Sequence, residues 1–197
     1  IPTIGKYGKN WITLISASKA FSFPGPRCAL AIISPHINEK KYTNLKKFCD
    51  REQFGHAFSL GGLYVTTSGT SHTAQYGLAK MLEAATSGEF NFIEITSEYG
   101  RRAEKVKEIF LKYGFEQVYK KDMDETVGNG FYLTMSYPGY GGNDLMLELL
   151  RYGISTITLK STGSVRHEGL RVCISFIGLD EMPTLENKLQ KFMEDHK

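Results

Sequence analysis

The sequence predicts an α/β fold, and two observations carry the prediction. Strand-like apolar runs at residues 11–18 and 27–34 alternate with segments whose apolar residues recur with the period of a helix. The run at 27–34 is apolar almost without a break, which is typical of a strand buried on both faces in a helix-covered sheet. A chain of 197 residues is long enough for one large domain or two small ones.

The first half of the chain is expected to form a strand pair followed by helices. A Pro-Gly-Pro turn at residues 24–26 separates the two strand-like runs. Residues 35–54 are polar and lysine-rich, which predicts a helix with a solvated face, and residues 62–71 are expected to form a loop. Ser71 or Thr73 is then suited to cap the next helix.

The second half holds the clearest helix of the chain, at residues 98–114. Its apolar residues fall on one stripe, and Gly114 supplies a stop signal. Short strands and one helix follow, and a last amphipathic helix is predicted from Pro183 onward. The glycine-rich residues 137–144 are expected to be a flexible connection, and residues 120–125 a solvated turn.

Composition excludes several classes of protein. The hydrophobic and charged shares of 41% and 23% are those of a soluble globular protein. The net charge of +3 is not gathered into one basic tract, which argues against nucleic acid as a partner. No apolar run has the length to span a membrane, and no signal segment opens the chain.

Cysteine and histidine usage points to a cytoplasmic protein without a metal site. An odd number of cysteines without metal-like spacing favours reduced thiols, at Cys28, Cys49 and Cys173. The five histidines also lack the spacing of zinc ligands.

One short stretch carries residue types suited to a phosphate-bearing cofactor. Lys19 is preceded by Ser16 and Ser18 and followed, eight residues on, by Arg27. A lysine amine forms a Schiff base with the aldehyde of pyridoxal phosphate, and the phosphate needs hydroxyl donors and the fork of an arginine. A surface lysine and an arginine paired with a carboxylate are the simpler alternative.

The same stretch resembles the lysine signature of the class I/II aminotransferases, which are fold type I pyridoxal-phosphate enzymes. The matching positions are Ser16, Ser18, Lys19, Arg27 and Ala29, with Gly25 at a small-residue position. Cys28 departs from the aliphatic residue usual there. Four further stretches are similar to the family, at residues 68–85, 101–118, 129–138 and 167–176.

The resemblance implies a particular form of the α/β fold. Residues 1–88 would be the end of the large cofactor-binding domain, with its mixed sheet, and residues 89–197 the small α/β C-terminal domain. Because the chain begins with Ile1 shortly before the lysine, we expect it to be the C-terminal half of a longer protein, incomplete and inactive alone. The lysine-rich segment 36–60 is longer than in many relatives and is interpreted as an insertion.

The resemblance also implies roles for single residues. Lys19 would hold pyridoxal phosphate as a Schiff base and move the substrate's Cα proton. Ser16 and Arg27 would bind the cofactor phosphate, with Ser18 a weaker candidate. Arg171 would bind the substrate α-carboxylate. Arg166 is its rival and is better interpreted as a solvated loop residue.

The function implied is that of a pyridoxal-phosphate-dependent aminotransferase, which moves an amino group between an amino acid and a 2-oxo acid as a homodimer. Residues 63–67 lack the arginine with which some relatives bind dicarboxylates, which argues against that mode of recognition. Two alternatives stay open. One is another reaction on the same scaffold, such as that of a carbon-sulfur lyase, and the other is a non-catalytic regulatory domain.

Overall fold

The computed structural model describes residues 4–196, which divide into two compact units. The first unit is Ile1–Phe92 and the second is Ile93–Lys197. No helix within residues 4–196 combines the length and the apolar composition that crossing a membrane requires.

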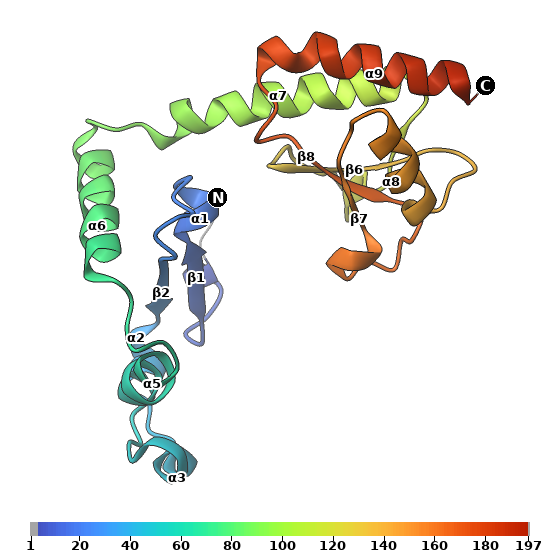
Figure 1. Cartoon of the computed structure of the whole chain (residues 1–197). Helices are drawn as coiled ribbons and strands as arrows, with labels where there is room; N and C mark the ends of the chain where they lie inside the picture. Colours follow the sequence, from blue (N-terminus) through green and yellow to red (C-terminus); the bar gives the residue numbers. More distant parts are fainter. Residues whose placement is uncertain (1–3, 197) are drawn as a thin grey trace. The chain divides into compact units, whose positions relative to one another are not determined.

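The N-terminal unit is built on a hairpin of two antiparallel strands (Figure 1). After a short 3-10 turn, η1 (Ile4–Lys6), β1 (Ile12–Ser16) pairs with β2 (Ala29–Ile33), so that Ser16 lies opposite Ala29. One turn of helix, α1 (Ala17–Ala20), follows β1 directly. The hairpin therefore brings the chain after residue 26 back beside the start of α1.

Only one face of this hairpin is covered. The helix α6 (His72–Ser87), with Ser71 at its N-cap as expected, packs Leu78 and Ala74 against Ala17 and Cys28. The expectation that the strand at 27–34 is buried on both faces is wrong, because Ala31 of β2 and its partner Leu14 of β1 are exposed on the face opposite Leu30, with Leu14 73% exposed. The two strands pair only with each other within the described residues, so no neighbouring strand extends the hairpin into a larger sheet there.

The single helix expected over residues 35–54 is also wrong. The chain forms four short turns instead: α2 (Pro35–Glu39), η2 (Thr43–Leu45), α3 (Lys46–Cys49) and α4 (Phe54–His56). Asp50 ends α3 in the left-handed conformation, with φ of 50°. A bridge between Lys41 and Gln53 then closes the loop that holds α3.

A loop was predicted at residues 62–71, but helical structure continues to Thr67. The π-helix η3 (Ala57–Tyr64) and α5 (Val65–Thr67) prolong α4. The Thr66 hydroxyl donates to the Gly62 carbonyl over 2.7 Å, and the Thr67 hydroxyl donates to the Leu63 carbonyl over 2.6 Å. These side-chain bonds satisfy carbonyls at a helix end, and Ser68 then ends the helix with a left-handed φ of 57°.

The C-terminal unit is a four-stranded sheet covered by helices. Its strand order is β3 (Glu116–Gln117), β6 (Tyr132–Ser136), β8 (Leu170–Cys173) and β7 (Ile157–Thr158), all paired antiparallel. The helices are α7 (Phe92–Lys112), α8 (Gly142–Arg151) and α9 (Met182–Asp195). The short turns η4 (Lys160–Thr162) and η5 (Leu179–Glu181) and a small hairpin of β4 (Lys121–Asp122) and β5 (Glu125–Thr126) complete the unit.

The core lies between this sheet and the helices α7 and α9, which run side by side (Figure 1). Alternate residues of the central strands point into it, namely Leu133, Met135, Leu170 and Val172. The residues between them, including Tyr132 and Arg171, lie on the opposite face and stay partly exposed. The strand alternation therefore leaves one face of the sheet available for chemistry.

Several predicted details of this unit can be compared with the structure. The last helix starts around Pro183, as expected, and Gly114 has the left-handed φ of 84° that a helix stop requires. The helix expected from residue 98 begins earlier, at Phe92. The expected solvated turn at 120–125 is the exposed hairpin β4–β5.

The glycine-rich segment 137–144 is not the flexible connection that was expected. Tyr137 and Tyr140 pack against the core, and Gly142 opens α8. A Cβ on Gly142 would lie 2.5 Å from the His167 carbonyl oxygen, so only glycine allows this approach.

Candidate functional site

Ala17 fixes the backbone around the lysine motif. Its side chain is fully buried, and its N–H donates to the Cys28 carbonyl over 3.1 Å. Its own carbonyl accepts from the N–H groups of Phe21 and Phe23, over 3.3 and 3.0 Å. These bonds tie the start of α1 to the start of β2, so the positions of residues 16–19 do not depend on side-chain packing alone.

Three of the four predicted site residues in the N-terminal unit lie around this anchor. Ser16 is the last residue of β1 and the N-cap of α1, and its exposed side chain makes no capping hydrogen bond. Ser18 is half-buried in α1, and Lys19 follows it as an exposed residue on the same turn.

Arg27 reaches back to this turn from the end of the hairpin loop. Its Nη1 donates to the Pro24 carbonyl over 2.9 Å and to the Ser18 hydroxyl over 3.3 Å. Arg27 also has a left-handed φ of 55°, a conformation that costs free energy for a residue with a Cβ. A strained arginine whose guanidinium meets the residue before Lys19 is consistent with a functional position.

The donors gathered here suit a phosphate group. A guanidinium contributes charge and several N–H donors in one plane, and the hydroxyls of Ser16 and Ser18 add neutral donors. The residues predicted from the sequence to bind a phosphate therefore carry the donor groups that a phosphate needs. The hydrogen bond between Ser18 and Arg27 brings two of them together.

Arg171 lies in the C-terminal unit, at the centre of the open sheet face. In β8 it stands opposite Thr134 of β6 on one side and Ile157 of β7 on the other. Its guanidinium carbon lies over the ring of Tyr132, 4.3 Å from the ring centroid. Among residues 4–196, no carboxylate forms an ion pair with it.

Its rival Arg166 differs, because two of its nitrogens already contact a carboxylate. Arg166 lies in the loop before β8, where its Nη2 and Nε contact one Glu168 carboxylate oxygen over 2.6 and 2.7 Å. The backbone N–H of Glu168 and the Arg166 guanidinium both lower the pKa of that carboxyl. Arg166 thus forms an exposed local ion pair within its loop.

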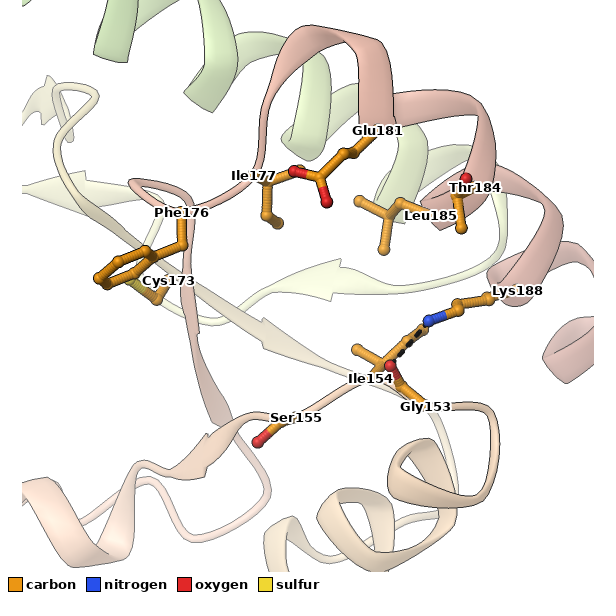
Figure 2. A pocket seen from close by; sticks show the side chains of 10 residues that line it. All are labelled: Gly153, Ile154, Ser155, Cys173, Phe176, Ile177, Glu181, Thr184, Leu185 and Lys188. Carbon is orange, nitrogen blue, oxygen red and sulfur yellow. Dashed lines mark hydrogen bonds between the residues drawn. The ribbon is translucent and has the colours of Figure 1, made fainter.

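A cavity of about 340 Å³ lies elsewhere in the C-terminal unit, between the end of β8 and α9. Figure 2 shows its lining, in which Lys188 of α9 reaches across to Gly153. The Lys188 amine donates to the Gly153 carbonyl over 2.9 Å, and the Glu181 carboxylate accepts from the Gly178 N–H over 2.8 Å. The charged side chains of Lys188 and Glu181 therefore bind backbone groups of this unit. None of the predicted site residues lines the cavity.

The described part of the chain contains no cluster of three or more histidine, cysteine, aspartate or glutamate side chains that suits a metal ion. The groups that could act at the predicted site are lysine, arginine and hydroxyl side chains.

The chain has the fold of the C-terminal part of the fold type I aminotransferases. No family model matches it, and no curated protein matches it by sequence. The aspartate aminotransferase of Thermotoga maritima superposes with a TM-score of 0.68 at 15% identity, over 98% of this chain and 44% of that one. The expected fold class is thereby confirmed.

Two further solved structures give the same result. The aromatic aminotransferase of Pyrococcus horikoshii has a TM-score of 0.69 at 15% identity, over 94% of this chain and 43% of its own. The α-aminoadipate aminotransferase LysN of Thermus thermophilus, complexed with N-(5'-phosphopyridoxyl)-L-leucine, has a TM-score of 0.65 at 15% identity, over 93% and 42%. The chain thus spans less than half the length of these structures, and the likeness is one of fold.

Tyr132 was not singled out from the sequence. Its stretch was recognised as a strand, but its contact with Arg171 depends on the pairing of β6 with β8. Strand register across a gap of this length is not readable from one sequence. An aromatic residue on the strand face opposite the core was the only available signal.

Proposed function

We propose that the intact protein containing this chain is a pyridoxal-phosphate-dependent aminotransferase. It transfers an amino group between an amino acid and a 2-oxo acid. In this proposal residues 1–88 end the large cofactor-binding domain, and residues 89–197 form the small domain. One observation carries the proposal: the 3.3 Å contact from Arg27 Nη1 to Ser18 Oγ, which holds a guanidinium beside the residue next to Lys19.

Arg27, Ser16 and Ser18 would bind the cofactor phosphate. The Arg27 guanidinium now donates to a neutral hydroxyl and a carbonyl, and a phosphate with nearly two negative charges is a stronger acceptor for the same donors. Ser16 adds a hydroxyl that α1 does not use as a cap. Replacing neutral acceptors by an anion favours binding without moving the backbone.

Lys19 would be the residue that moves the proton. Pyridoxal phosphate, when bound, supplies an aldehyde that condenses with amines and a ring that withdraws electrons from the substrate Cα. The Lys19 amine would take the proton from the substrate Cα and return it to the product. Its backbone is held through Ala17, which gives the amine a defined position for this transfer.

Arg171 would bind the substrate α-carboxylate. Its in-plane N–H groups match the two oxygens of a carboxylate, and such a bidentate pair fixes the direction of the Cα–H bond. The absence of arginine from residues 63–67 argues against a dicarboxylate substrate held from that position. The resemblance adds that the intact protein is a cytoplasmic homodimer.

Labelling of the lysine tests this proposal. Intact protein is incubated with pyridoxal phosphate, its visible absorption is recorded, and the bond is reduced with borohydride before peptide mass analysis. We expect a visible band, and the reduced cofactor mass on the peptide containing Lys19. Lys19→Ala abolishes both signals, whereas Lys9→Ala, a control lysine of the same unit, leaves both unchanged.

Three results would count against the proposal in different ways. Wild-type protein without band or label contradicts it and favours the regulatory domain. Label on a lysine other than Lys19 contradicts the assignment of the site. A labelled enzyme that releases ammonia and a 2-oxo acid from a sulfur amino acid, without transferring the amino group, points to the carbon-sulfur lyase.

A further inference from the structure

We propose that Tyr132 is a positioning residue, which holds the Arg171 guanidinium over its ring on the open sheet face, ready for a substrate carboxylate. The inference rests on the proposed function and adds a residue to it. The two residues come from neighbouring strands. Arg171 of β8 stands opposite Thr134 of β6, so Tyr132, two residues away on β6, is its diagonal neighbour on the same face.

The contact with the ring leaves the Arg171 guanidinium without a carboxylate partner among residues 4–196. A cation over a ring is attracted by the negative face of the aromatic system, and the guanidinium carbon lies 4.3 Å from the Tyr132 centroid. All five N–H groups of a guanidinium lie in its own plane and point outward from its edges. Contact with an aromatic ring therefore restrains the group without an anion that would compete with a substrate carboxylate for these donors.

Arg166 and Arg171 differ in the donors that they leave for a substrate carboxylate. Arg166 is held by a carboxylate that accepts from its Nε and Nη2, the donors a substrate would need. Arg171 forms no ion pair with any carboxylate of residues 4–196, and its pairing partners in the sheet are Thr134 and Ile157. The Tyr132 ring restrains Arg171 and leaves its positive charge unpaired by a carboxylate of residues 4–196, whereas a salt bridge would have neutralised that charge.

The contact also offsets a cost of binding. An arginine side chain has several rotatable bonds, and a carboxylate that immobilises a mobile arginine loses affinity for that reason. Tyr132 limits this freedom before the substrate arrives. The ring is 39% exposed and lies on the face opposite the core, so packing in the core does not explain its position.

The test uses intact protein with pyridoxal phosphate and compares an amino acid with the amine that lacks its carboxylate. For Tyr132→Leu we expect the KM of the amino acid to rise about three- to tenfold, the range expected for losing a cation–π contact. The KM of the amine and the cofactor absorption should not change. Tyr132→Phe keeps the ring and should restore the wild-type KM.

A matched control separates this role from a general effect of removing a tyrosine. Tyr119 is 38% exposed, close to the value for Tyr132, but its hydroxyl bonds to Ser164. Tyr119→Leu should leave the KM of the amino acid unchanged.

Each other outcome overturns the inference. An unchanged KM in Tyr132→Leu shows that Arg171 needs no ring. An equal loss for amine and amino acid shows a general structural effect, and a loss in Tyr132→Phe assigns the role to the hydroxyl. In all three cases wild-type protein still carries the Lys19 label, so the proposed function stands. Absence of that label in wild-type protein overturns both.

Discussion

The two units of the chain differ in how they are stabilised. In the C-terminal unit a continuous core lies between the sheet and the helices α7 and α9, with Phe110, Leu149 and Phe192 among its fully buried members. In the N-terminal unit the described buried cluster holds only Ala17, Cys28, Ala74 and Leu78. The C-terminal unit is stabilised by packing of its core, and the N-terminal unit relies more on local backbone hydrogen bonds such as those of Ala17.

This difference explains where apolar surface remains. Leu14 on the uncovered face of the hairpin is 73% exposed, although a leucine gains free energy from burial. The lysine motif thus lies on a thinly packed element, while Arg171 lies on a densely packed one. We expect mutations of equal size to have unequal effects in the two units.

The largest effect is expected for Phe192→Ala. Phe192 is fully buried, with ring centroids 5.5 Å from Phe115 and 5.0 Å from Tyr137. Removing its ring should lower the free energy of unfolding by about 3–5 kcal/mol, because it loses burial and leaves a cavity. Urea unfolding followed by far-UV circular dichroism measures the loss, and hydrogen exchange should place it in residues 93–196.

The matched change in the other unit is Leu14→Thr. Because Leu14 is mostly exposed, stability should change by no more than about 0.5 kcal/mol. Trp11, the single tryptophan, belongs to this unit, so its fluorescence follows the unit during unfolding. A loss comparable to that of Phe192→Ala would refute the contrast between the two units.

A smaller effect is expected for Gly142→Ala. The added Cβ would meet the carbonyl oxygens of His167 and Gly169 at 2.5 and 2.9 Å, and both belong to backbone that cannot easily move. We expect a loss of about 1–3 kcal/mol, measured by thermal unfolding. Gly130→Ala is the control, because a Cβ added there would have no neighbour within 4 Å. Equal melting temperatures for the two variants would contradict the close approach at Gly142.

The smallest effect concerns the hydrogen bond from the Tyr152 hydroxyl to Asp195 Oδ2, which is 2.7 Å long. This bond, with burial and the Asp195 charge, raises the pKa of Tyr152 from 10.0 to about 12. A raised pKa means that the stabilisation is present below pH 10 and is lost as the pH rises through about 12.

Tyr152→Phe removes this bond. At neutral pH the variant should be less stable than wild type by about 1 kcal/mol or less, because the pair is partly solvated. Denaturation at several pH values up to 12 should show the two proteins converging above pH 10. A difference that does not depend on pH would show that the hydroxyl contributes packing alone.

Sequence reasoning succeeded where the signal is local. The helix end before Gly114, the helix start after Ser71 and the last helix start near Pro183 depend on neighbouring residues, and all three are present, although the Ser71 side chain makes no capping hydrogen bond. It failed at residues 35–54, where composition indicated a helix but the left-handed Asp50 and the Lys41–Gln53 bridge break the chain. Those features depend on how the segment folds back on itself.

The candidate site also has features that the sequence predicted and features that only the structure shows. The spacing of Lys19 and Arg27 singled out the candidate phosphate-binding residues, and the hairpin brings Arg27 to Ser18. The choice of Arg171 over Arg166 followed from the resemblance of residues 167–176 to the aminotransferase family. The carboxylate beside Arg166 and the ring beneath Arg171 became visible only in the structure.

The sequence by itself therefore determined the α/β class, a few helix ends and the residue types of the site, because periodicity, capping and motif spacing are properties of short segments. The tertiary structure alone decided which strand faces are covered, which arginine keeps its donors and that Tyr132 lies beneath Arg171. Those features arise from strand register and packing between residues far apart in the chain, and no local pattern encodes them.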